Sequence, residues 1–301
     1  MIYDLFCFFN ELDVLEERLE YLYNHVDYFV LCESDTTHSG KKKCLYFNEN
    51  INRFDKYKAK IIHVVFPGNS TVKNAWENEN LQRNYLAKNI NFTKDDKIMI
   101  SDVDEIPSHK FISKLSRYDG SSLLIAIQEL SFFWPNYRRN DLPFWMGGTR
   151  GFNFKNVDEL NYLNEYYSST FLAFLNYGTT LTKVRLTNVG IPINNGGWHL
   201  SYMGGKNSIK NKIYSFAHTE EVERIGVDFE MFIDDFIKTG RNFFGKNEFY
   251  IINGTFKNKI LDSYVGRTTN FTFFLRLKWC FKRKLMIFKI NYFYYAKMLL
   301  R

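Results

Sequence analysis

The sequence contains few cysteines, few prolines and no long hydrophobic segment. Its four cysteines, in 301 residues, have no C-x-x-C spacing, so neither a disulfide framework nor a zinc site is expected. No charge-free apolar run is long enough to cross a bilayer. The first residues also lack the basic and small-residue pattern of a secretory signal. These absences predict a cytoplasmic protein without a membrane-spanning helix.

Positive charge is concentrated near the C-terminus. The formal net charge is +7, but residues 263–301 hold nine basic residues and no acidic one, so the rest of the chain is close to neutral. Aromatic residues alternate with these basic residues, as in segments that lie on an anionic membrane surface. We therefore predict a globular domain over residues 1–262 and a basic, aromatic helical tail over residues 263–301. The tail would bind the membrane peripherally. The alternative is a helix that packs on the body with its lysines snorkelling into solvent.

The first hundred residues alternate between strand and helix patterns. Such alternation is typical of an α/β fold with a parallel sheet. Ligands bind beyond the carboxyl ends of the strands in such a sheet. Strands are predicted at residues 2–9, 28–32, 61–66, 97–101, 122–134 and 144–157, and helices at 13–26, 77–90, 158–167 and 222–239.

Three of the predicted strands end at polar or acidic residues, namely Asn10 with Glu11, Glu33, and the pair Asp102 and Asp104. Two carboxylates at positions i and i+2 suit a hard cation such as Mg²⁺ or Mn²⁺, which completes its shell with phosphate oxygens. About one such pair is expected by chance in a chain of this composition. The prediction of a metal site therefore depends on the position of the pair directly after the fourth predicted strand. The alternative is that both acids cap the helix that follows.

The chain resembles a known family around this acid pair. The string Asp102-Val103-Asp104-Glu105-Ile106-Pro107 resembles the diagnostic core of glycosyltransferase family 17, which includes enzymes that add a bisecting N-acetylglucosamine to N-glycans. The resemblance covers roughly residues 3–240 and implies a GT-A fold, an inverting mechanism, a UDP-sugar donor and a divalent metal. Other segments similar to the family, in the same order, are Phe8-Phe9-Asn10-Glu11-Leu12-Asp13, Phe29-Val30-Leu31-Cys32-Glu33-Ser34, Phe132-Phe133-Trp134 and Gly197-Trp198-His199-Leu200-Ser201.

The resemblance also suggests roles for single residues. Glu33 would accept a hydrogen bond from the nucleoside, or it is an ordinary strand-end acid. Arg83 would bind the diphosphate, for which arginine is well suited, or it lies on a solvated helix face. His199 would complete the metal shell, and His218 is the rival for this role.

Inverting transfer needs a general base that takes the proton of the acceptor hydroxyl. Asp158, at a predicted helix start, is the first candidate, with Glu159 beside it. Asp158 has an alternative role as a helix N-cap. Glu129 and Asp141 remain possible bases, and Trp134 and Trp198 are candidates to stack on sugar faces.

The sequence as a whole therefore predicts a single GT-A domain that transfers a sugar, by default N-acetylglucosamine, to a glycan or lipid-linked acceptor. A metal-dependent phosphohydrolase could use the same carboxylates. A different class of function is a non-catalytic glycan-binding or membrane-adaptor protein. Nucleic acid is not an expected partner, because the candidate site is acidic.

Overall fold

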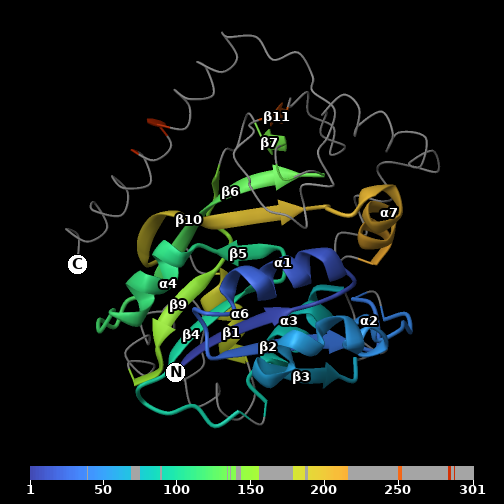
Figure 1. Ribbon diagram of the computed structural model, residues 1–301, viewed down its shortest axis with the longest axis horizontal. Helices are drawn as coiled ribbons and strands as arrows, with labels where there is room; N and C mark the ends of the chain where they lie inside the picture. The colour runs from blue at the N-terminus through green and yellow to red at the C-terminus, as the bar shows by residue number, and fades with distance from the viewer. Residues whose placement is uncertain are drawn as a thin grey trace.

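The structure, a computed structural model, describes most of the first 155 residues and parts of the rest. The residues described are 1–38, 40–68, 75–88, 90–133, 135, 137–139, 144–155, 179–186, 189–215, 250–252, 284–285 and 288. Over these residues the chain forms one mixed sheet of eleven strands with helices on both of its faces (Figure 1). Among the described helices, none is long and apolar enough to cross a bilayer.

Four strands form the parallel part of the sheet, in the order β4-β1-β2-β3. The order of the chain therefore reverses between β1 and β4, and in open α/β sheets ligands bind at such a point, beyond the carboxyl ends of the strands. The four strands are β1 (Ile2–Cys7), β2 (Tyr28–Ser34), β3 (Ile61–Phe66) and β4 (Lys97–Asp102).

The remaining strands extend the sheet beyond β4. β9 pairs with β4 in the antiparallel direction, β6 pairs with β9, and the long β10 runs parallel to β6 and carries β5 on its other side. The bounds are β5 (Glu105–Pro107), β6 (Leu124–Phe132), β7 (Tyr137–Arg139), β8 (Phe144–Trp145), β9 (Arg150–Asn153), β10 (Ile191–Ser201) and β11 (Tyr250–Ile252).

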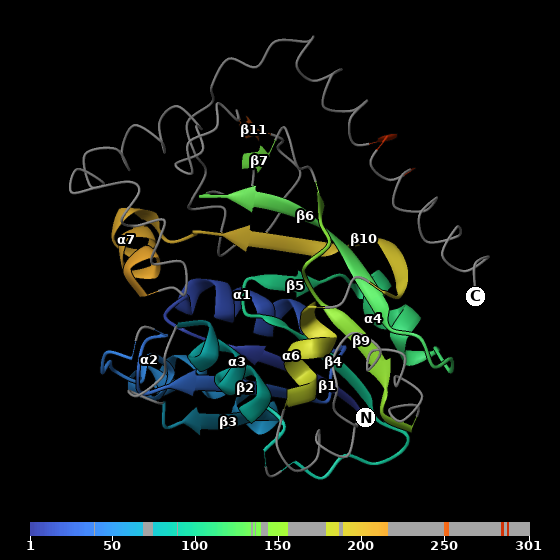
Figure 2. The same cartoon turned by 180° about the vertical axis from the view of Figure 1, so that it is seen from behind.

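The helices cover the parallel strands from both sides. α1 packs on one face, and α3 and α6 pack on the other, as Figure 2 shows from behind. The helices are α1 (Leu12–Leu22), α2 (Tyr46–Glu49), the 3₁₀ helix η1 (Ile51–Lys60), α3 (Ala75–Tyr85), α4 (His109–Ser116), α6 (Thr179–Leu186) and α7 (Gly205–Ser215).

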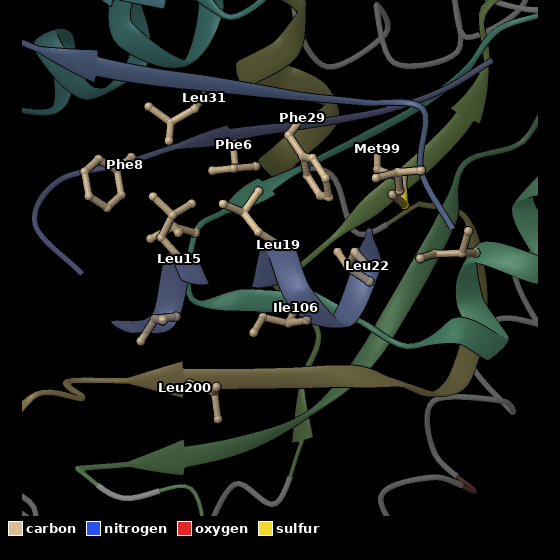
Figure 3. Packing of buried hydrophobic residues seen from close by; sticks show 14 of the residues in the cluster. Phe6, Phe8, Leu15, Leu19, Leu22, Phe29, Leu31, Met99, Ile106 and Leu200 are labelled. Carbon is tan, nitrogen blue, oxygen red and sulfur yellow. The ribbon is translucent and has the colours of Figure 1, made fainter. Parts of the chain in front are cut away.

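Helix α1 lies in the middle of the larger hydrophobic core. Its leucines Leu15 and Leu19 are fully buried and point toward Phe6 of β1, while Ile106 and Leu200 close the core from the side of β5 and β10 (Figure 3). Apolar residues three and four positions apart put one stripe of a helix toward a core. Because α1 is covered on two sides, some of its polar side chains are buried as well, among them Arg18.

The α/β fold predicted for the first hundred residues is confirmed by the parallel strands and crossover helices. The strand predicted over residues 144–157 is wrong: β8 and β9 are separate, with Gly147 and Gly148 between them. A Cβ at Gly148 would lie 1.6 Å from Gln128 Oε1, so any other residue there would require the Gln128 side chain to move. The helix predicted over 77–90 ends at Tyr85. The helices predicted at 158–167 and 222–239 lie outside the described residues.

Candidate functional site

A pocket of about 650 Å³ lies at the carboxyl ends of β1 and β4, where the strand order reverses. Cys7, the last residue of β1, is paired with Asp102, the last residue of β4, and both line the pocket. Segments far apart in the sequence complete the lining. They contribute Glu11 before α1, Arg83 on α3, Arg185 on α6, His199 on β10 and Lys212 on α7.

Asp102 is held between two arginines. Its Oδ1 accepts a hydrogen bond from Arg83 Nη2 at 3.1 Å, and its Oδ2 accepts one from Arg185 Nη2 at 3.2 Å. Burial by itself would raise the pKa of Asp102, but Arg83 and Arg185 outweigh it and lower the pKa to about 2. About a third of the side chain is exposed, at 35%. The carboxylate is therefore ionised and accessible from the pocket.

Asp104 is paired with a lysine and faces a histidine. Its Oδ2 accepts a hydrogen bond from Lys212 Nζ at 2.6 Å, and its Oδ1 lies 3.6 Å from His199 Nε2. Burial opposes ionisation, but Lys212 and His199 outweigh it and hold the pKa of Asp104 far below its usual range. Lys212 Nζ also lies 2.8 Å from Glu11 Oε1, so one ammonium bridges two carboxylates.

Arg18 fixes the backbone of the turn that carries both aspartates. Its guanidinium is fully buried and donates two hydrogen bonds to Asp4, from Nε at 2.8 Å and from Nη2 at 2.6 Å. Its Nη1 donates to the carbonyl oxygens of Asp102, Val103 and Glu105 at 3.1, 3.2 and 3.0 Å. Arg18 therefore links the backbone of the turn to α1 and β1, and the side chains of Asp102 and Asp104 line the pocket.

Glu105 supports the same turn from the other side. Its Oε2 accepts a hydrogen bond from the backbone N–H of Asp102 at 2.9 Å, and its Oε1 accepts from Trp145 Nε1 at 2.7 Å and from Arg185. Burial raises the pKa of Glu105 despite the nearby Arg185, which lowers it. Glu105 therefore connects Asp102 to Arg185 and to the wall of the pocket.

Comparison with known proteins shows that the N-terminal part of this chain is similar to one family. The model of glycosyltransferase family 17 matches residues 1–148, which include the turn and the acid pair. Over these residues the chain is similar to glycosyltransferase family 17. The family resemblance predicted from the sequence is confirmed.

The curated relatives carry one enzyme name, beta-1,4-mannosyl-glycoprotein 4-beta-N-acetylglucosaminyltransferase. The human protein is 27% identical over 271 residues, which is 80% of this chain and 48% of that protein. The rat protein is 26% identical over 268 residues, with the same coverage. The chain thus spans about half the length of the curated relatives it matches.

Among solved structures, HddC from Yersinia pseudotuberculosis is 11% identical, with a TM-score of 0.35, over 66% of this chain and 89% of that one. The inositol-1-phosphate CTP transferase from T. maritima is also 11% identical, with a TM-score of 0.30, over 60% of this chain and 72% of that one.

The structure brings together five of the residues singled out from the sequence. Glu11, Arg83, Asp102, Asp104 and His199 all line the pocket. Among the residues that the structure describes, no three His, Cys, Asp or Glu side chains are grouped to hold a metal ion. The acid pair therefore has basic partners around it, rather than a complete set of protein ligands for a metal.

Glu33 and Asn10 are placed differently from the prediction. Glu33 is fully buried and does not line the pocket. Its carboxylate accepts hydrogen bonds from the backbone N–H groups of Phe47 and Asn48, both at 3.1 Å, and lies 2.8 Å from His63 Nε2. The structure thus corrects its predicted role at the nucleoside: Glu33 holds the first turn of α2. Asn10 is also absent from the pocket lining.

The other predicted residues lie elsewhere or outside the described chain. Trp198 packs edge-on against Tyr21, with ring centroids 5.5 Å apart, and neither Trp198 nor Glu129 lines the pocket. The candidates outside the described residues are Asp158, Glu159, His218, Trp134 and Asp141.

Arg185 and Lys212 are two basic partners of the acid pair that the sequence did not indicate. Arg185 lies in a segment with no clear hydrophobic period, and Lys212 follows Lys206 and Lys210 in a run that is typical of a solvated helix face. The signal that could have found them is the charge of the acidic turn, because buried carboxylates require nearby basic partners.

Proposed function

We propose that this chain is an inverting glycosyltransferase with a GT-A fold that uses a UDP-sugar, by default UDP-N-acetylglucosamine, and a glycan or lipid-linked acceptor. The observation that carries the proposal is the pair Asp102 and Asp104, ionised in a pocket at the point where the strand order reverses. The match of residues 1–148 to the family 17 model and the N-acetylglucosaminyltransferase name of the curated relatives support the choice of reaction and sugar.

Two arginines provide the expected diphosphate site. Arg83 and Arg185 are buried and both contact Asp102, which orients them. The Nε atom of each has no hydrogen-bond partner among the described residues. A buried N–H group without a partner costs free energy until a ligand satisfies it. Guanidinium groups bind phosphate oxygens in a fixed planar geometry, so a diphosphate that entered here would meet two pre-oriented donors.

The residues at the acid pair fit a divalent cation such as Mn²⁺ or Mg²⁺. Such a cation is commonly held by one or two carboxylates and by phosphate oxygens of the substrate, so two aspartates are sufficient protein ligands. His199 faces Asp104, and its Nδ1 is buried with no partner among the described residues. A cation held by Asp102 and Asp104 would neutralise charge on the leaving diphosphate.

The acceptor hydroxyl must lose a proton as it attacks the anomeric carbon. Asp158 remains the proposed general base, with Glu159 as its neighbouring alternative. In an inverting transfer the base lies on the face of the sugar opposite the diphosphate. A candidate can therefore be recognised by the effect of its amide variant, which should lower turnover and leave donor binding unchanged.

The test is release of UDP from a panel of UDP-sugars in the presence of Mn²⁺ and candidate acceptors. We expect wild-type protein to release UDP and Asp104→Asn to lose this activity. Asp55→Asn is the matched control, because it makes the same change on an exposed acid of η1. Release of UMP and sugar 1-phosphate without sugar transfer would support a phosphohydrolase. Absence of any nucleotide turnover would support a non-catalytic binding protein.

We also propose that residues 263–301 attach the protein to the cytoplasmic surface of an anionic membrane. Of these residues the structure describes Lys284, Leu285 and Phe288, and all three are exposed. The basic charge attracts anionic lipid, and the rings favour the headgroup boundary. Co-sedimentation with phosphatidylserine vesicles tests this proposal. Replacing Lys282, Arg283 and Lys284 by glutamine in the full chain should weaken binding, and equal binding would refute the proposal.

A further inference from the structure

Lys212 occupies an unusual place in the pocket, because its ammonium joins three separate segments. It reaches from α7 to Asp104 in the turn after β4, at 2.6 Å, and to Glu11 in the loop before α1, at 2.8 Å. All three side chains are almost completely buried, with exposures of 6–8%. Burial would lower the pKa of Lys212, but Asp104 and Glu11 outweigh it and raise the pKa, so the ammonium is charged at neutral pH.

Asp104 is also one of the two carboxylates that would hold the divalent cation. Asp104 is the second acid of the pair, and one of its two oxygens already accepts a short hydrogen bond from Lys212. Two positive charges on one carboxylate repel strongly in a site from which water is largely excluded. The ammonium and a divalent cation therefore compete for Asp104.

We propose that Lys212 is a resident counter-cation, which occupies Asp104 and Glu11 in the ligand-free protein and moves to the donor diphosphate when a divalent cation takes its place. This inference rests on the proposed function, since it concerns the same pocket and the same metal–diphosphate ligand. It gives Lys212 two successive roles, first as the partner of Asp104 and Glu11 and then as a donor to the diphosphate.

The charges of the site favour this exchange. Glu11 and Asp104 carry two negative charges, of which one ammonium compensates half and a divalent cation compensates all. The displaced ammonium then adds positive charge to the pocket when the dianionic diphosphate enters. Metal and nucleotide should consequently bind with positive coupling, because each removes an obstacle to the other.

The side chain and its surroundings allow the movement. Lysine carries a compact charge on a flexible four-carbon stem. Lys212 donates to the side chains of Asp104 and Glu11, whereas Arg18 donates to three backbone carbonyl oxygens. The ring of Tyr202, also in the pocket lining, has its centroid 5.8 Å from Lys212 Nζ and offers a surface along which the ammonium can turn.

Binding of Mn²⁺ to the nucleotide-free protein tests the competition directly. Free Mn²⁺ is measured by its electron paramagnetic resonance signal for wild type, Lys212→Gln and Lys212→Arg, with Lys210→Gln as the control on the same helix. Loss of a charged hydrogen-bonding competitor should tighten Mn²⁺ binding about tenfold to a hundredfold in Lys212→Gln. Lys212→Arg and Lys210→Gln should not tighten it by more than about twofold.

A second titration distinguishes exchange from a structural role. With Mn²⁺ saturating, UDP should bind Lys212→Gln about tenfold more weakly than wild type, because the diphosphate loses one charged donor. A structural lysine would weaken both ligands together. Unchanged or weaker Mn²⁺ binding by folded Lys212→Gln overturns the inference.

Wild-type protein provides an independent measurement if Lys212→Gln does not fold. A buried, salt-bridged ammonium gives a slowly exchanging lysine NMR signal, which is assigned by its loss in Lys212→Arg. We expect the chemical shift of this signal to change on addition of Mg²⁺ with UDP, and to stay unchanged with UDP alone. An unchanged signal in the Mg²⁺–UDP complex overturns the inference. The proposed function fails separately, if wild-type protein turns over no UDP-sugar.

Discussion

Arg18 allows a direct test of how the acidic turn is held in place. We expect Arg18→Met to destabilise the fold by about 3–5 kcal/mol, the usual cost of leaving one partner of a buried ion pair uncompensated. Here the uncompensated partner is Asp4, which is fully buried and receives two hydrogen bonds from Arg18. Methionine keeps an apolar stem beside Phe6, the ring that Arg18 covers, so the loss is mainly electrostatic.

The matched control for this prediction is Arg53→Met. Arg53 forms ion pairs at similar distances, with Asp13 at 2.6 Å and Glu16 at 2.8 Å, but it is partly exposed. Exposed ion pairs contribute about 0–1 kcal/mol. Both variants remove an arginine with short ion pairs, but Arg18 is fully buried and also donates to three backbone carbonyl oxygens.

Equilibrium unfolding in urea measures both variants, together with the double variant Arg18→Met, Asp4→Asn. The double variant should recover part of the lost stability, because it removes the unpaired charge. The remaining loss reports the carbonyl oxygens of Asp102, Val103 and Glu105, each of which loses its hydrogen bond from Arg18 Nη1. If Arg18→Met costs no more than Arg53→Met, the reasoning about the buried guanidinium is refuted.

Three further predictions concern side chains of the site and its surroundings. Asp102 has a pKa of about 2, below its ordinary value, so the stability that its ionised form contributes is present above about pH 4 and is lost as the pH falls toward 2. The difference in unfolding free energy between wild type and Asp102→Asn, measured in urea, should therefore shrink over that range. A constant difference would contradict this. Arg185→Lys should raise the KM for the donor about tenfold, because one ammonium cannot replace a guanidinium that binds both Asp102 and Glu105. An unchanged KM in steady-state kinetics would contradict this role of Arg185. Glu33→Gln should destabilise the protein by about 1–3 kcal/mol in urea unfolding and leave UDP affinity unchanged. Weaker UDP binding would instead support a role of Glu33 in binding the nucleotide.

The parallel half of the fold could be predicted because its signals are local. Leu5 and Phe6 are adjacent, face opposite sides of β1 and are both fully buried. Continuous apolar runs of this kind are typical of strands covered on both faces. Leu15, Leu19 and Leu22 then give the helical stripe of the next element. The position of Asp102 at the end of β4 followed from the same patterns, without any knowledge of distant contacts.

The partners of the acids could not be predicted in the same way. Lys212 lies 108 residues from Asp104, and Arg185 lies 80 residues from Glu105. No periodicity links positions so far apart. Glu33, in contrast, was predicted at the nucleoside but contacts α2, because an acid at the end of a strand looks the same in sequence whether it faces a ligand or a helix. Its contacts with α2 and His63 depend on how the chain returns after β2.

The pairing of charges in the pocket also limits what ligand it can accept. Asp102 and Asp104 are ionised against arginine and lysine, and breaking such buried pairs is costly unless the ligand replaces each lost charge. A neutral sugar alone offers no such replacement, and a bare diphosphate would compete with the carboxylates for the arginines. A divalent cation together with a diphosphate brings positive charge to the aspartates and negative charge to Arg83 and Arg185. The two should therefore bind as a complex, and a nucleotide-sugar without metal should bind weakly even where its sugar fits.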